Sequence, residues 1–142
     1  MERGKAVVVD ASVAVKWFNA EEYSDLADLL KNKHVKGDLT LTAPVLIIFE
    51  VANALRYSPD FSVNDVKDTV KDLLDLQVAL YFPEKEWMEG AVETAYNYGI
   101  TIYDACYIVL AKNLKTFLYT ADEKLLERVN DPTLKHISEL RH

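Results

Sequence analysis

At residues 5–18 the sequence is KAVVVDASVAVKWF, in which a short run of β-branched residues passes directly into a helical pattern. Residues 5–10 predict a strand, since valine favours a pleated, half-buried backbone, and residues 12–18 predict a short helix. A strand that is apolar throughout is typical of a parallel sheet covered on both faces. The rest of the chain repeats this alternation of strand and helix, which predicts an α/β fold.

The other predicted elements follow from the same two patterns. Further short β-rich runs lie at residues 39–42, 77–82, 116–120 and 134–137. Stretches with helical spacing lie at residues 22–33, 44–57, 63–76, 84–98, 103–113 and 122–129. We expect Pro44 in the first turn of its helix, Ser62 as an N-cap and Gly99 as a C-terminal stop. The helix after Ser62 has an apolar stripe, which we expect to be buried, made of Val63, Val66, Val70, Leu73 and Leu74. No linker rich in Gly or Pro divides the chain, so we expect a single domain over residues 1–142.

The composition limits the class of protein. The chain has 142 residues, of which 50% are hydrophobic and 27% charged, as in an ordinary globular protein and unlike a disordered one. Its apolar runs are far shorter than the ~20 residues of a membrane span, and acids interrupt the N-terminal run, unlike in a signal peptide. Cys106 is the only cysteine, so no internal disulfide can form. We therefore expect a cytoplasmic protein without a membrane partner, and a core position for Cys106.

Four acids fall where a parallel sheet would gather them. Asp10 ends the first predicted strand, Asp122 follows a later strand by two residues, and Asp104 begins a helix. Ligands of open α/β sheets bind outside the carboxyl ends of the strands. The fourth acid, Glu50, is embedded in the apolar stretch VLIIFEVANAL. These positions make all four acids candidate site residues.

Each acid also has a structural explanation to be weighed. Asp104 matches a capping box with Thr101, and Asp10 is a suitable cap for the helix that follows it. The last helix has two candidate caps, Asp122 itself or Thr120 in a capping box with Glu123. Glu50 cannot be a cap, because it lies in the middle of a predicted helix. It also has no cation one helical turn away to form an ion pair with it. A Glu on an apolar helix is costly to bury without a partner, which favours a functional role. We expect Asn53, on the same helix face, to be its polar companion.

Taken together, the four acids indicate a metal site. Carboxylates that converge raise one another's pKa and repel each other unless a cation lies between them. The three His residues are scattered along the chain, so the ligands would be oxygens, which favour Mg²⁺ or Mn²⁺ over zinc. Such an ion activates a water and offsets the charge that builds up on a phosphodiester in its transition state.

Four blocks of the sequence resemble the PIN-domain ribonucleases, and specifically the VapC-type toxins of prokaryotic toxin–antitoxin pairs. The blocks are VVVDASVAVKWF (7–18), FEVANAL (49–55), YDACYIVLA (103–111) and YTADEKL (119–125). They come in the family's order, at its usual separations, and together they cover nearly the whole chain. The resemblance implies a three-layer α/β/α fold with a parallel sheet of four to five strands.

The resemblance also implies metal-dependent endonucleolytic cleavage of RNA. The implied metal-binding acids, which would hold one or two Mg²⁺ or Mn²⁺ ions, are Asp10, Glu50, Asp104 and Asp122. The implied supporting residues, which would position ligands or water, are Ser12, Asn53 and Thr120. An antitoxin protein that covers or enters the site is implied as a partner, and homodimers are common in the family.

The acidity of the chain sets a condition on RNA binding. The formal net charge is −7, which argues against tight non-specific binding of nucleic acid. RNA contacts would therefore need a local basic rim. The candidates for it are Lys16, Arg56, Lys112 and Lys115.

Other functions fit the residues less well. In a non-enzymatic binding module, the acids would hold a structural ion or pair with an Arg of a partner, and the variant Asp104→Asn separates this alternative from catalysis. A response-regulator receiver domain needs two adjacent acids after its first strand, where Asp10 stands alone. A haloacid-dehalogenase-like phosphatase needs the pattern D-x-D, where this sequence has DAS.

Overall fold

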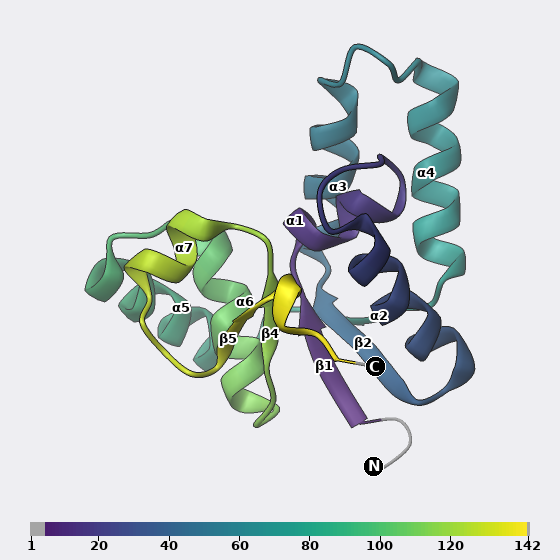
Figure 1. Ribbon diagram of the computed structural model, residues 1–142. Helices are drawn as coiled ribbons and strands as arrows, with labels where there is room; N and C mark the ends of the chain where they lie inside the picture. The colour runs from purple at the N-terminus through teal and green to yellow at the C-terminus, as the bar shows by residue number, and fades with distance from the viewer. Residues whose placement is uncertain (1–4, 142) are drawn as a thin grey trace.

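A five-stranded parallel sheet forms the centre of residues 5–141, the part of the chain that the computed structural model describes (Figure 1). The strands are β1 (Lys5–Val9), β2 (Leu39–Pro44), β3 (Ala79–Tyr81), β4 (Leu118–Thr120) and β5 (Leu134–His136). Their order across the sheet is β3-β2-β1-β4-β5, with every pair parallel. The strand order reverses at β1, so the carboxyl ends of β1 and β4 form the switch point where ligands of such sheets bind.

Helices cover both faces of this sheet. They are α1 (Ala11–Ala14), α2 (Ser24–Lys36), α3 (Leu46–Arg56), α4 (Val63–Asp75), α5 (Lys85–Tyr98), α6 (Ile102–Asn113) and α7 (Glu123–Arg128), with the 3₁₀ helices η1 (Val15–Trp17) and η2 (Ile137–Glu139). Helix α6 packs on β1, β2 and β4, while α2 packs on β2 from the opposite side of the sheet (Figure 1). The predicted three-layer α/β/α fold is confirmed. Helices α3 and α4 lie side by side and extend beyond the carboxyl end of the sheet (Figure 1).

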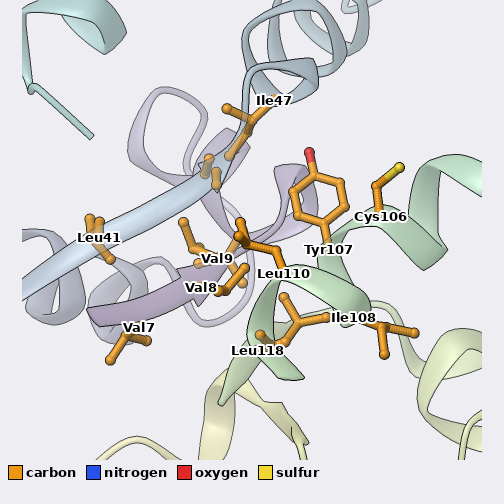
Figure 2. Packing of buried hydrophobic residues seen from close by; sticks show 14 of the residues in the cluster. Val7, Val8, Val9, Leu41, Ile47, Cys106, Tyr107, Ile108, Leu110 and Leu118 are labelled. Atoms are coloured by element: carbon orange, nitrogen blue, oxygen red, sulfur yellow. The ribbon is translucent and has the colours of Figure 1, made fainter. Parts of the chain in front are cut away.

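The central strand and α6 share one apolar core (Figure 2). Val8, Val9 and Leu118 are completely buried, and Ile108 of α6 is 1% exposed. Each such side chain stabilises the fold by roughly 1.5–3 kcal/mol through burial. Cys106 is buried as predicted, with its sulfur 3.9 Å from the sulfur of Met88. Because this core fixes α6, the start of the helix is held rigidly at the carboxyl edge of the sheet.

Local capping explains where several elements begin and end. Ser62 caps α4 in a reciprocal box with Asp65, with hydrogen bonds of 3.1 and 2.9 Å. Gly99 ends α5 at a φ of 65°, a left-handed conformation that glycine adopts without the Cβ penalty. Both sequence predictions are confirmed.

Two predictions about helices α3 and α4 are wrong in detail. Pro44 does not lie in the first turn of α3 but ends β2, where it pairs with Tyr81. Proline lacks an N–H, and the next residue, Val45, makes the ladder hydrogen bond to the Tyr81 carbonyl at 3.0 Å. In α4, Val63 and Leu74 are 73% and 51% exposed, although their spacing placed them on the buried stripe.

Two further expectations concern the chain as a whole. The single domain expected over residues 1–142 includes residues 1–4 and 142, which lie outside the described residues, so its full extent stays a prediction. Within residues 5–141, no helix is both long enough and apolar enough to cross a membrane.

Candidate active site

Asp10 lies directly after the central strand and is almost fully buried. It is the N-cap of α1, and its Oδ1 accepts a hydrogen bond from the Val13 N–H at 3.3 Å. The Ser12 hydroxyl donates to the same oxygen at 2.5 Å. Only 6% of Asp10 is exposed. The predicted capping role is therefore real, but it occupies a single carboxylate oxygen and does not account for the burial of a charge.

Ser12 joins the ends of β1 and β4. Its hydroxyl oxygen lies 3.3 Å from the Thr120 hydroxyl and accepts the Ala121 N–H at 2.8 Å. The Thr120 hydroxyl in turn accepts the Asp122 N–H at 3.1 Å. These bonds fix Asp10 and Asp122 relative to each other across the switch point.

The two other aspartates begin the helices that follow. Asp122 caps α7, where its Oδ1 accepts the Leu125 N–H at 3.1 Å. Asp104 lies in the first turn of α6, and its own N–H donates to the Thr101 hydroxyl at 3.0 Å. Thr101 is thus the N-cap that the sequence predicted. Asp104 remains at the mouth of a buried helix with its carboxylate half-buried.

Glu50 reaches the site from α3 and has a partner on another helix. The Tyr107 hydroxyl of α6 donates to Glu50 Oε1 at 2.6 Å. The predicted companion, Asn53, is exposed, and no hydrogen bond joins it to Glu50 in the described chain. Sequence reasoning missed Tyr107, although one signal was available. A tyrosine three residues after Asp104 lies on the same side of the helix, and a buried phenol needs a hydrogen-bond acceptor.

The pKa values show that the acids form one electrostatic group. Burial raises the pKa of Asp10 from its usual 3.8 to about 6, against the opposing effect of hydrogen bonds from Ser12 and other donors, and the charge of Asp104 raises it further. Burial also raises the pKa of Glu50, and Asp104 adds to that rise. Burial followed by the charge of Asp122 raises the pKa of Asp104. Asp104 therefore lies within electrostatic reach of the other three acids.

No cation of the described chain balances this group. The ion pairs found among residues 5–141 involve none of the four acids. Of the candidates for a basic rim, Lys16 is buried and pairs with Glu21 at 3.2 Å. Lys112 pairs with Asp131 at 2.8 Å. It lies near the far end of α6, about 12 Å along the helix from Asp104 at 1.5 Å per residue.

The donor set fits a hard divalent cation in its chemistry. Three of the carboxylates are anchored through one oxygen each, Asp10 and Asp122 through Oδ1 and Glu50 through Oε1. Each has a second oxygen for a metal ion. The side chains lie near one another without forming a closed ligand set, since no three His, Cys, Asp or Glu groups within residues 5–141 are arranged to hold an ion. Oxygen-only donors of this kind suit Mg²⁺ or Mn²⁺.

A largely apolar groove runs beside the acids between α3 and α4. It has a volume of about 1410 Å³, and Glu50 and Tyr103 form part of its wall. Phe49, which is 71% exposed, belongs to the same lining. Cations on the groove are Arg56, Lys67 and Lys71. Of the four lysines and arginines predicted to form a basic rim, Arg56 thus lies near the site.

Comparison with known proteins gives consistent results. The sequence profile of the PIN domain family matches residues 7–132. Ribonuclease VapC3 of Pyrobaculum aerophilum is 30% identical over 129 residues, which are 86% of this chain and 93% of that protein.

Solved structures share the fold at lower identity. A toxin–antitoxin complex from Klebsiella pneumoniae superimposes with a TM-score of 0.67 and 13% identity, over 94% of this chain and 99% of that chain. VapC20, a sarcin–ricin loop cleaving toxin of Mycobacterium tuberculosis, gives a TM-score of 0.65 and 14% identity, over 82% and 89% of the two chains. At these identities the superpositions indicate a common fold.

Proposed function

The chain belongs to the PIN domain family, with VapC-type relatives, and on this premise we propose that it is a metal-dependent endoribonuclease that acts as the toxin of a toxin–antitoxin pair. The observation that carries the proposal is the group of four acids at the switch point, which no cation of the described chain balances. A purely structural group of carboxylates would be expected to have partners, since unpaired buried charge is costly.

In this proposal, one or two Mg²⁺ or Mn²⁺ ions are held by Asp10, Asp104 and Asp122, and Glu50 binds directly or through water. When bound, the ion would supply an activated water and offset the charge that develops on the RNA phosphodiester. The chain's own groups prepare the ligands. The Ser12 hydroxyl and the Val13 N–H hold Asp10 through Oδ1.

The remaining predicted supports act at different points. The Thr120 hydroxyl accepts a hydrogen bond from the Asp122 N–H. This bond fixes the backbone of Asp122 relative to the end of β4. Asn53 lies one helical turn from Glu50, and we propose that it contacts RNA or water rather than the Glu50 carboxylate, because it is exposed on the groove.

The test is cleavage of RNA by the purified protein. We expect EDTA to abolish cleavage and Mn²⁺ to restore it. Asp104→Asn should reduce the rate roughly a hundredfold or more, since even the outer partners of metal ligands contribute 10–100-fold. Asp131→Asn is the matched control, because Asp131 lies in the loop after α7 and pairs with Lys112 near the far end of α6. Cleavage that persists in EDTA, or in Asp104→Asn, would reject the proposal in favour of a non-catalytic binding module.

We propose that the partner antitoxin covers the groove between α3 and α4. The groove combines a largely apolar lining with Glu50, one of the four acids, so it suits an amphipathic segment that also carries a cation. Such a segment would place its apolar side against Phe49 and Val66 and its cation against the carboxylates, in the position of the metal. The same binding would exclude RNA.

The test of this partner uses a short DNA-binding protein encoded by a neighbouring reading frame. We expect it to inhibit cleavage, and we expect Val66→Asp to weaken the inhibition at least tenfold while cleavage itself is retained. Inhibition that Val66→Asp leaves intact would move the antitoxin to another surface. Two expectations stay predictions. The homodimer implied by the family resemblance is to be checked by light scattering, and the cytoplasmic location expected from the sequence by cell fractionation.

A further inference from the structure

Tyr107 is a core residue with a polar end at the site. It is 2% exposed and lies in the buried stretch of α6. Its hydroxyl donates to Glu50 Oε1 at 2.6 Å, across 57 residues of sequence and from one helix to another. Figure 2 shows the ring beside the apolar cluster of Val8, Val9 and Leu110, with the hydroxyl directed away from it. The side chain thus packs at one end and bonds at the other.

Three of the four acids act on the Tyr107 hydroxyl through their charges. Burial raises the pKa of Tyr107, and the charges of Glu50, Asp10 and Asp104 raise it further. In the hydrogen bond between Tyr107 and Glu50, the phenol is the donor and Glu50 Oε1 is the acceptor. The hydrogen bond in turn favours the ionised form of Glu50, whose pKa burial raises and Tyr107 lowers.

Glu50 needs such a support more than the aspartates do. Its longer side chain leaves from mid-helix, and it lacks the backbone N–H contacts that hold Asp10 and Asp122 at their capping positions. Without the phenol, the carboxylate would be free to turn toward the open groove that Glu50 also lines. With it, Oε1 is occupied, and Oε2 is the oxygen that this bond leaves for another partner.

We propose that Tyr107 is a positioning residue of the metal site, which holds Glu50 through Oε1 so that Oε2 alone is offered to the ion or to its water. This inference rests on the proposed function. It assigns a role in metal binding to a residue that packing alone would classify as core. The competing explanation is that Tyr107 only fills space, and a phenylalanine would then serve equally well.

The experiment is a double-mutant cycle on Mn²⁺ affinity, measured by titration calorimetry on the full chain without RNA. The variants are Tyr107→Phe, Glu50→Gln and the double variant. Tyr96→Phe is the matched control, because it makes the same change in an exposed tyrosine of α5. We expect Tyr107→Phe to weaken Mn²⁺ binding about tenfold, in the range for groups that orient metal ligands. The double variant should bind as Glu50→Gln does, within about twofold, because both changes remove the same contact.

Tyr107→Phe keeps the ring and its packing, and a circular dichroism melt of each variant verifies that it is folded before titration. Two results would overturn the inference. One is a Tyr107→Phe variant that binds Mn²⁺ as tightly as the wild type, and the other is a double variant in which the two single effects multiply. A wild type that binds no Mn²⁺ would instead overturn the proposed function, and this inference with it.

Discussion

The pKa values of two aspartates in this protein, Asp10 and Asp131, are shifted in opposite directions. At the carboxyl edge of the sheet, burial raises the pKa of Asp10 to about 6. Near the other end of α6, the hydrogen bond from Lys112 lowers the pKa of Asp131 to about 2, with help from the Thr133 N–H. Both carboxylates accept backbone hydrogen bonds, at 3.3 Å from Val13 and 2.8 Å from Thr133. Two differences separate them. Asp10 is almost fully buried, and a cation lies 2.8 Å from Asp131, while no ion pair of the described chain involves Asp10.

The contrast separates an acid that serves the fold from one that serves a site. The ion pair of Asp131 favours its charged form, so the loop after α7 gains from ionisation. Asp10 is buried, and the negative charge of Asp104 also acts on it. The ionised form of Asp10 therefore lowers the stability of the fold until a cation binds. Capping explains the position of Asp10 at the start of α1 but not its burial beside other acids. A buried acid with a raised pKa and no cation partner lowers stability, and such acids are common at functional sites.

The largest effect should be on cleavage. Asp10→Asn keeps a good N-cap and removes one metal-binding charge, so we expect the rate of RNA cleavage to fall roughly a hundredfold or more. Asp131→Asn makes the same chemical change at the paired site and should leave the rate within about twofold. Both are measured on one RNA at saturating Mn²⁺. Equal losses in the two variants would remove the distinction between the two aspartates.

Next in size is an effect on stability with the opposite sign. In metal-free protein at pH 7, Asp10→Asn should raise the free energy of unfolding by about 2 kcal/mol, because it removes a buried charge whose pKa burial has raised. Urea denaturation in EDTA measures this change. A variant less stable than the wild type would mean that ionised Asp10 is already compensated within the chain.

The pH dependence follows from the same shift. Between pH of about 4 and 6, folded Asp10 binds more protons than the unfolded chain does, because its folded pKa lies above the usual 3.8. The stability of the metal-free wild type should therefore fall as pH rises through this window, and Glu50 and Asp104 act in the same direction. Asp10→Asn should flatten the fall. Urea midpoints at several pH values would contradict this if they rose across the window.

The smallest effect belongs to the ion pair. Lys112→Met leaves Asp131 without its cation, and since Lys112 is 48% exposed, we expect a loss of at most about 1 kcal/mol. The loss should shrink in high salt, and cleavage should not change. A large loss of cleavage in Lys112→Met would indicate that this end of α6 takes part in RNA binding after all.

Much of the fold was predictable because local patterns and the topology agree. Apolar strands alternating with helices require a parallel sheet, and the acids that follow β1 and β4 then meet at one edge. Capping by Ser62 and Gly99 depends on near neighbours and was predicted correctly. Pro44 was not, because the strand ladder that extends β2 by its pairing with Tyr81 is a tertiary contact.

The site was less predictable where partners come from distant elements. Asn53 was the polar neighbour available on the helix of Glu50, while the actual partner, Tyr107, comes from α6. A basic rim chosen from charge alone also failed for Lys16 and Lys112, since each is paired with a nearby acid. Sequence spacing reports what lies on one element, and contacts between elements depend on how the sheet brings them together.

The most direct test of the central claim is an anomalous difference map from crystals soaked in Mn²⁺. A divalent ion at the switch point should give a peak about 2.0–2.2 Å from carboxylate oxygens, a distance typical of Mg²⁺-like ions. We predict that these oxygens belong to Asp10, Asp104 and Asp122, with Glu50 direct or one water removed. A well-ordered site without a peak at millimolar Mn²⁺, or with its peak on another surface, would contradict the account.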